Sequence, residues 1–184
     1  MFVKNYWTYI FIAATSTVSL CLSLLLSIRM AISIPQGLIL LVFTVLLALA
    51  CKSDFESRTI DFKLSYTLLL AALLYQVASL DMDEIIKAIA SAVLTLTLLL
   101  ICSIILKKIK GEDCLGRGDL RTMPAVAAVL NFKACFVSLF FACLLGILAI
   151  FIYQAISKTK VETFPFCPII LLWFCIGLLF LNVA

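Results

Sequence analysis

The sequence predicts an all-α, polytopic membrane protein with six to seven transmembrane helices, and three observations support this class. Hydrophobic residues make up 65% of the 184 and charged residues only 13%, whereas globular domains average about 45–50% apolar and about 25% charged residues. The mean hydropathy is +1.25. Long apolar runs alternate with short polar loops, which leaves no room for a separate aqueous domain beside that many spans.

Seven apolar segments cover most of the chain. Trp7–Ile28 is long enough to span a bilayer and lacks the cleavage pattern of a signal peptide, so we expect an extra anchor at residues 1–30. A six-helix domain at residues 31–184 would follow. Its expected helices are Ala31–Cys51, Leu64–Leu80, Ile85–Leu106, Asp119–Asn131, Phe132–Ile156 and Phe164–Ala184. Asp119–Asn131 is too short to cross alone and begins at a charge, which suits a helix buried among other helices.

The charged loops predict the orientation in the membrane. With the N-terminus in the cytoplasm, eleven Lys and Arg residues fall inside and only Arg29, Lys87 and Lys133 fall outside. Cytoplasmic loops carry an excess of these residues, so the bias favours this orientation. The net charge of +4 therefore reports topology and indicates no nucleic-acid partner. The same orientation places Asp54 and Asp119 together on the cytoplasmic side.

The eight cysteines do not indicate a metal site. None forms a C-x-x-C pair, and the chain has no histidine, which makes a zinc site of the usual Cys/His kind improbable. Most cysteines lie in or beside apolar runs, where cysteine behaves as a small hydrophobic residue. We therefore interpret them as reduced packing residues and expect no metal and no other cofactor.

The candidate site is built around the stretch Gly116-Arg117-Gly118-Asp119-Leu120-Arg121. Its two glycines allow tight or extended backbone. The aspartate lies where an apolar segment begins, and a carboxylate at that depth is costly unless it has a use. We expect Asp119 to be one half of a catalytic pair. The other half is Asp54, which follows the cytoplasmic end of a separate span.

Two carboxylates that share one proton can hydrolyse a peptide bond. One acts as base toward water while the other protonates the leaving amine. Their close approach raises the pKa of one member, and the pair then titrates as a unit. Without histidine, a serine or cysteine triad lacks its usual base. The helix dipole would favour the charged form of Asp119, which makes Asp54 the better candidate for the protonated partner.

Other interpretations of the two aspartates remain open. Asp54 would then be an ordinary loop residue and Asp119 a helix N-cap, a role that aspartate fills well. The protein would be a non-enzymatic membrane assembly factor or a small transporter, with a structural or ion-binding aspartate pair. A transporter more often has broken helices and charges near the middle of the membrane. Here every acid lies in a loop or at the end of a span, which favours chemistry at the interface.

Three motifs together resemble the prepilin peptidase family, membrane aspartic proteases of the G-x-G-D type. The first is Asp54-Phe55-Glu56-Ser57-Arg58-Thr59-Ile60, which is similar to the family's first-aspartate loop. The second is the G-x-G-D stretch, with the basic Arg121 two positions after the aspartate. The third is Phe164-Pro165-Phe166-Cys167-Pro168, which is similar to the family's P-F-G-P. The chain departs from the family at Asp61-Phe62, where Pro-Asn or Pro-Asp is usual, and at Cys167, where glycine is typical.

The resemblance implies an aspartic endopeptidase of the bacterial cytoplasmic (inner) membrane, with Asp54 and Asp119 catalytic and Gly116, Gly118 and Arg121 supporting the motif. The implied substrate is a pilin or pseudopilin precursor, whose short basic leader ends in glycine and is cut at the cytoplasmic face. Acids in the same two loops would attract that leader, namely Glu56, Asp61, Glu112 and Asp113. A preflagellin-like or other G-x-G-D protease would share the aspartate pair.

Larger members of that family carry an N-terminal cytoplasmic domain linked to N-methylation of the mature pilin. Nothing in this sequence resembles that domain. We therefore expect a short form that has peptidase activity without methyltransferase activity.

Overall fold

The computed structural model describes residues 33–57, 60–110, 116, 118–130, 132–157 and 167–180, and three single positions nearer the N-terminus. Within these residues every regular element is a helix, which confirms the predicted all-α class. The helices are α2 (Ile34–Ser57), α3 (Phe62–Val77), α4 (Met82–Lys110), α5 (Asp119–Val129), α6 (Phe132–Ser157) and α7 (Cys167–Phe180). The predicted anchor Trp7–Ile28 lies outside the described residues except at those single positions.

Among the residues that the structure describes, two helices are long and apolar enough to cross a membrane. They are Ile34–Asp54 within α2 and Met82–Ile109 within α4, with mean hydropathies of 2.4 and 2.7. Three shorter apolar stretches lie in other helices, namely Phe62–Val77 (α3), Lys133–Leu145 within α6 and Ile169–Leu178 within α7. The total of six to seven spans therefore stays a prediction.

The end of α2 differs from the sequence prediction at a place that concerns the candidate site. The sequence predicts a polar loop over Lys52–Lys63, but the helix continues to Ser57. Lys52 and Glu56 lie one turn apart on it, with Nζ and Oε1 separated by 4.0 Å. Such i,i+4 pairs are compatible with a helix that runs on beyond its apolar part. Asp54 therefore belongs to the last turn of a helix and not to a loop.

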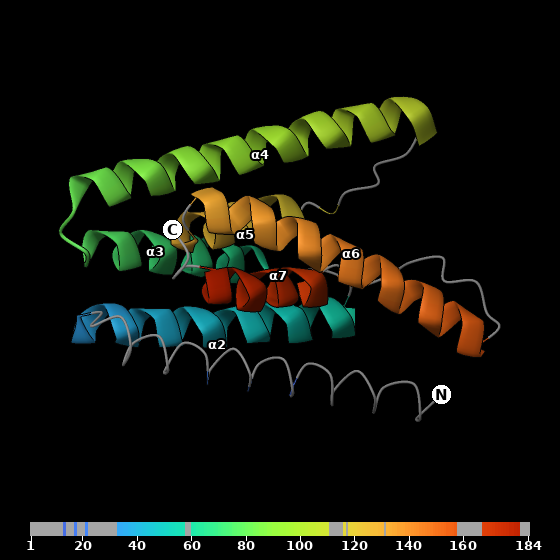
Figure 1. Cartoon of the computed structure of the whole chain (residues 1–184), viewed down its shortest axis with the longest axis horizontal. Coiled ribbons are helices and arrows are strands. Elements are labelled where there is room, and N and C mark those ends of the chain that lie inside the picture. Colours follow the sequence, from blue (N-terminus) through green and yellow to red (C-terminus); the bar gives the residue numbers. More distant parts are fainter. Residues whose placement is uncertain are drawn as a thin grey trace.

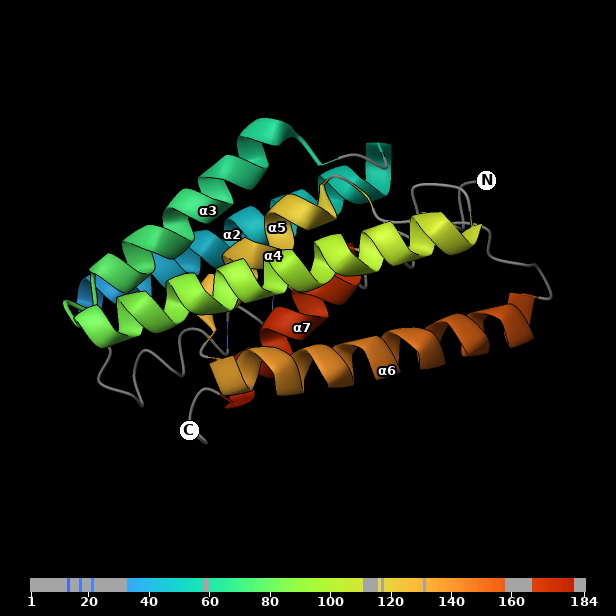
Figure 2. The ribbon, with the colours of Figure 1, turned by 90° about the horizontal axis from the view of Figure 1, so that it is seen from above.

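The short helix α5 is the central element of the fold. It packs against α3 and α4, and α3 packs in turn against α2; Figures 1 and 2 show α5 between α3 and α4. Every residue of α5 from Thr122 to Val129 is buried. This confirms the prediction that a short helix beginning at a charge is enclosed by its neighbours.

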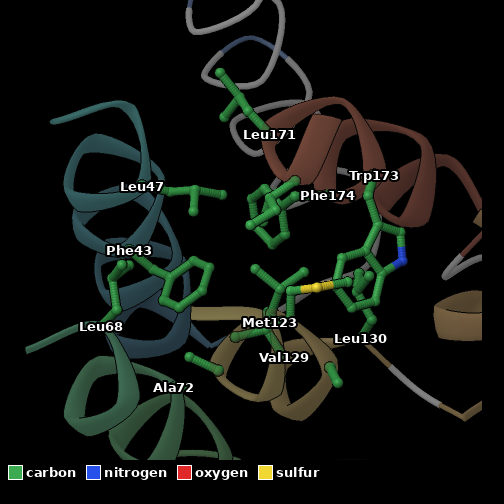
Figure 3. Close-up of a cluster of buried hydrophobic side chains, with 14 of the residues drawn as sticks. Phe43, Leu47, Leu68, Ala72, Met123, Val129, Leu130, Leu171, Trp173 and Phe174 are labelled. Carbon is green, nitrogen blue, oxygen red and sulfur yellow. The ribbon is translucent and has the colours of Figure 1, made fainter. Parts of the chain in front are cut away.

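The hydrophobic core joins α2, α3, α5 and α7. Phe43 of α2 and Phe174 of α7 are fully buried, and their ring centroids are 5.2 Å apart (Figure 3). Trp173 is fully buried as well, and its indole N–H donates to the carbonyl of Cys135 on α6 over 2.8 Å. A buried indole usually needs such a partner. These contacts fix α7 against both α2 and α6.

A buried glutamine joins α3 to α5 at the end away from the aspartates. The side-chain amide of Gln76 donates to the carbonyl of Ala128 in the last turn of α5. Carbonyls in the last turn of a helix have no partner within that helix. The bond therefore satisfies a buried acceptor and joins the end of α3 to the end of α5.

Candidate active site

The structure brings Asp54 and Asp119 together from different helices. Asp54 lies in the last turn of α2 and is 9% exposed. Asp119 is the first residue of α5 and is partly buried. The charge of Asp54 is close enough to Asp119 to disfavour ionisation of its carboxyl group. The pairing expected from the sequence is therefore present in the fold.

The protonation of Asp119 depends on its surroundings in the fold. Burial raises its pKa to about 6, and the negative charge of Asp54 acts in the same direction. A backbone hydrogen bond from Gly116 opposes both effects without cancelling them. Loss of hydration disfavours the charged form of Asp119, whereas the positive end of the α5 dipole favours it. The raised pKa of Asp119 runs against the dipole effect from which the sequence predicted Asp54 as the protonated partner.

The two glycines of the motif make room for side chains. A Cβ at Gly116 would lie 2.9 Å from Oδ2 of Asp119, and one at Gly118 would lie 3.0 Å from Cβ of Ile60. Gly118 has ordinary helical torsions, with φ −65° and ψ −46°. The backbone freedom predicted from the sequence is therefore not what Gly118 supplies. It allows a close approach between the start of α5 and the segment that precedes α3.

The start of α5 does not support the alternative in which Asp119 is only a helix cap. The N-cap position belongs to Gly118, which has no side chain to make a capping bond. Two backbone hydrogen bonds of the motif instead join residues on either side of the aspartate. The carbonyl of Gly116 accepts from the N–H of Leu120 over 3.3 Å, and the carbonyl of Gly118 accepts from the N–H of Thr122 over 3.0 Å.

The segment Ile60-Asp61-Phe62 lies against the start of α5. Ile60 packs on Gly118, and the Phe62 ring lies under the guanidinium group of Arg121, with 4.6 Å from Cζ to the ring centroid. Asp61 caps α3, since its Oδ1 accepts from the backbone N–H of Lys63 over 3.2 Å. The departure from the family pattern at Asp61-Phe62 thus provides a cap and an aromatic contact. Sequence reasoning assigned no role to Phe62, although an aromatic beside a cap and one turn before Tyr66 was a usable signal.

The other acids predicted to contact a basic leader are placed only in part. Glu56 is exposed at the end of α2, where its neighbour Lys52 offsets some of its charge. Asp61 is exposed although it caps α3. Glu112 and Asp113 lie outside the described residues. The third motif is likewise described only from Cys167 onward, at the start of α7.

The fold and the site together define a helical protein with spanning-length helices and a paired-carboxylate site at one end of the bundle. The model of the type IV leader peptidase family matches residues 41–151, more than half of the chain. The chain belongs to this family, which makes it a peptidase and, with its two long apolar helices, indicates a membrane protein. The matched region contains both aspartates and both glycines. No curated protein and no solved structure shows significant similarity to the chain.

Proposed function

We propose that the protein is a membrane-embedded aspartic endopeptidase that removes the short basic leader from type IV pilin or pseudopilin precursors. One observation carries this proposal. Asp54 and Asp119 reach one another from α2 and α5, and the pKa of Asp119 is raised to about 6 by burial and by the charge of Asp54. Two neighbouring carboxyl groups, one of which has a raised pKa, are the arrangement that aspartic proteases use.

The proton distribution suggests a role for each aspartate. Asp54 acts as the base that takes a proton from water, while the water oxygen attacks the carbonyl carbon of the scissile peptide bond. Asp119 supplies its proton to the leaving nitrogen as the carbon–nitrogen bond breaks. The proton taken up by Asp54 then returns to Asp119, which restores the pair. The two carboxyl groups of the protein account for every proton transferred in these steps.

Charges around the site support cleavage at the cytoplasmic face. Basic residues lie near the end of α2, the start of α3, the end of α4 and the start of α5, as expected for the cytoplasmic side. They are Lys52, Lys63, Lys107, Lys108 and Arg121. Exposed Glu56 and Asp61 would attract the basic leader at that end. We place the protein in the bacterial cytoplasmic membrane as a multi-pass protein.

Cleavage of a purified prepilin by the wild-type protein in proteoliposomes tests the proposed function. We expect release of the leader directly after its terminal glycine, identified by mass spectrometry of both products. A prepilin in which that glycine is replaced by a bulky residue serves as the control substrate. Cleavage of a preflagellin alone would assign a different substrate class. Inertness toward several precursors of both kinds would favour the non-enzymatic assembly factor or transporter.

Cleavage should slow as the pH rises above about 6. The mechanism requires a proton on Asp119, and a carboxyl group with a pKa of about 6 loses that proton as the pH rises through this value. Each further pH unit should lower kcat/KM by about tenfold. A profile of kcat/KM between about pH 5 and pH 8 checks this. A rate that stays constant across that range would contradict the assignment of the acid to Asp119.

A further inference from the structure

The relative position of the two aspartates depends on α3. Asp54 ends α2 and Asp119 begins α5, and α3 packs against both helices. The segment that starts α3 therefore lies where a small displacement would change the separation of the two carboxyl groups. Figure 2 shows the start of α3 close to the end of α2 and the start of α5.

Two residues of that segment contact α5 on either side of Asp119 in sequence. Ile60 packs on Gly118, and the ring of Phe62 contacts the guanidinium group of Arg121. Asp61 lies between them and caps α3, so that the helix begins at Phe62. Phe62 is further held by Tyr66, with ring centroids 4.3 Å apart. The ring of Phe62 is thus held in place by residues at the start of α3.

Arg121 is placed to act on the backbone of α5. Side chains two positions apart lie on nearly opposite sides of a helix, so Arg121 points away from the side of α5 that presents Asp119. A guanidinium group over an aromatic face is attracted by the negative potential of the ring. This attraction draws the first turn of α5, and Asp119 with it, toward α3.

We propose that the contact between Phe62 and Arg121 holds Asp119 in its position beside Asp54. Phe62 and Arg121 are then positioning residues of the peptidase. The catalytic consequence rests on the proposed function. The geometric consequence, which is the separation of the two carboxyl groups, does not rest on it. These groups interact whether or not a substrate is present. Each consequence has its own measurement.

The catalytic consequence is tested with paired substitutions. Phe62→Leu and Arg121→Met remove the ring or the charge and keep a side chain of similar bulk. We expect each to lower kcat by about tenfold or more while KM changes little, because misplaced catalytic groups affect the chemical step. Phe62→Trp and Arg121→Lys retain a cation over a ring and should retain most of the activity. Equal activity in all four variants would overturn the proposal.

The geometric consequence is tested without a substrate. Carbodiimide modifies protonated carboxyl groups, so labelling of Asp119 against pH, quantified by mass spectrometry, reports its pKa. In Phe62→Leu and Arg121→Met, Asp54 lies farther from Asp119, and the midpoint should fall from about 6 toward the ordinary value of 3.8. In Arg121→Met, loss of the positive charge alone would raise the midpoint of Asp119 labelling. A fall in this midpoint therefore identifies a change in the position of Asp119. An unchanged midpoint in both variants would overturn the proposal.

Two control variants separate this contact from general loosening of the bundle. Gln76→Leu removes the hydrogen bond between α3 and α5 at the opposite end. Phe140→Leu removes an exposed aromatic contact, that of Phe140 with Phe141 on α6. Both should leave the labelling midpoint of Asp119 unchanged. If the wild type cleaves no precursor but the midpoint falls as expected, the proposed function fails and the positioning role stands.

Discussion

Replacing either Asp54 or Asp119 by asparagine should lower kcat/KM for leader cleavage by at least about 10³-fold. Asparagine keeps the size and much of the hydrogen bonding of aspartate but can neither take nor supply the proton. Because the two carboxyl groups act as one unit, the double variant should be no worse than either single variant. Initial rates with equal amounts of membrane-inserted protein measure the effect. Cleavage within about tenfold of the wild-type rate by either variant would remove that aspartate from the mechanism.

Thermal unfolding in detergent provides the control for that result. The pKa of Asp119 is raised in the folded protein, so the unfolded chain releases this proton first as the pH rises. The wild type therefore loses stability between about pH 4 and about pH 6, through the interval between the two pKa values. Asp119→Asn has no such loss and should have a higher Tm than the wild type near neutral pH. An inactive variant that is equally or more stable has lost chemistry and not its fold.

Replacing Gly118 by valine should lower leader cleavage by about 10²-fold and destabilise the protein by about 1–3 kcal/mol. A Cβ at this position would lie 3.0 Å from Cβ and 3.1 Å from both Cγ1 and Cδ1 of Ile60. Ile60 is buried and cannot move into open space. The added side chain must therefore separate the start of α3 from the start of α5.

A second-site change makes this prediction specific. Gly118 has helical torsions that other residues also adopt, so the loss should come from the contact and not from backbone strain. Gly118→Ala should be milder than Gly118→Val. Adding Ile60→Ala to Gly118→Ala removes two of the three crowded atoms and should restore part of the activity. Full activity in Gly118→Val, or no recovery in the double variant, would contradict the close approach as the reason for this glycine.

The sequence by itself determined the class of fold and the identity of the paired acids. Its apolar composition and short charged loops favour helices, because a backbone in lipid must satisfy its hydrogen bonds internally. The short segment after Asp119 begins at a charge, and it is buried between α3 and α4 as that pattern predicts. The motifs around Asp54 and Asp119 indicated the family, which the family match confirms.

Only the tertiary structure decided how those acids are held and that the pKa of Asp119 is raised. The pKa of Asp119 depends on its burial and on a charge from another helix, and neither is encoded in the residues next to it. The contacts of Ile60 with Gly118 and of Phe62 with Arg121 join segments far apart in the chain. A local pattern predicts which residues are apolar or helical. Close packing between distant segments sets the distances and burial on which the chemistry depends.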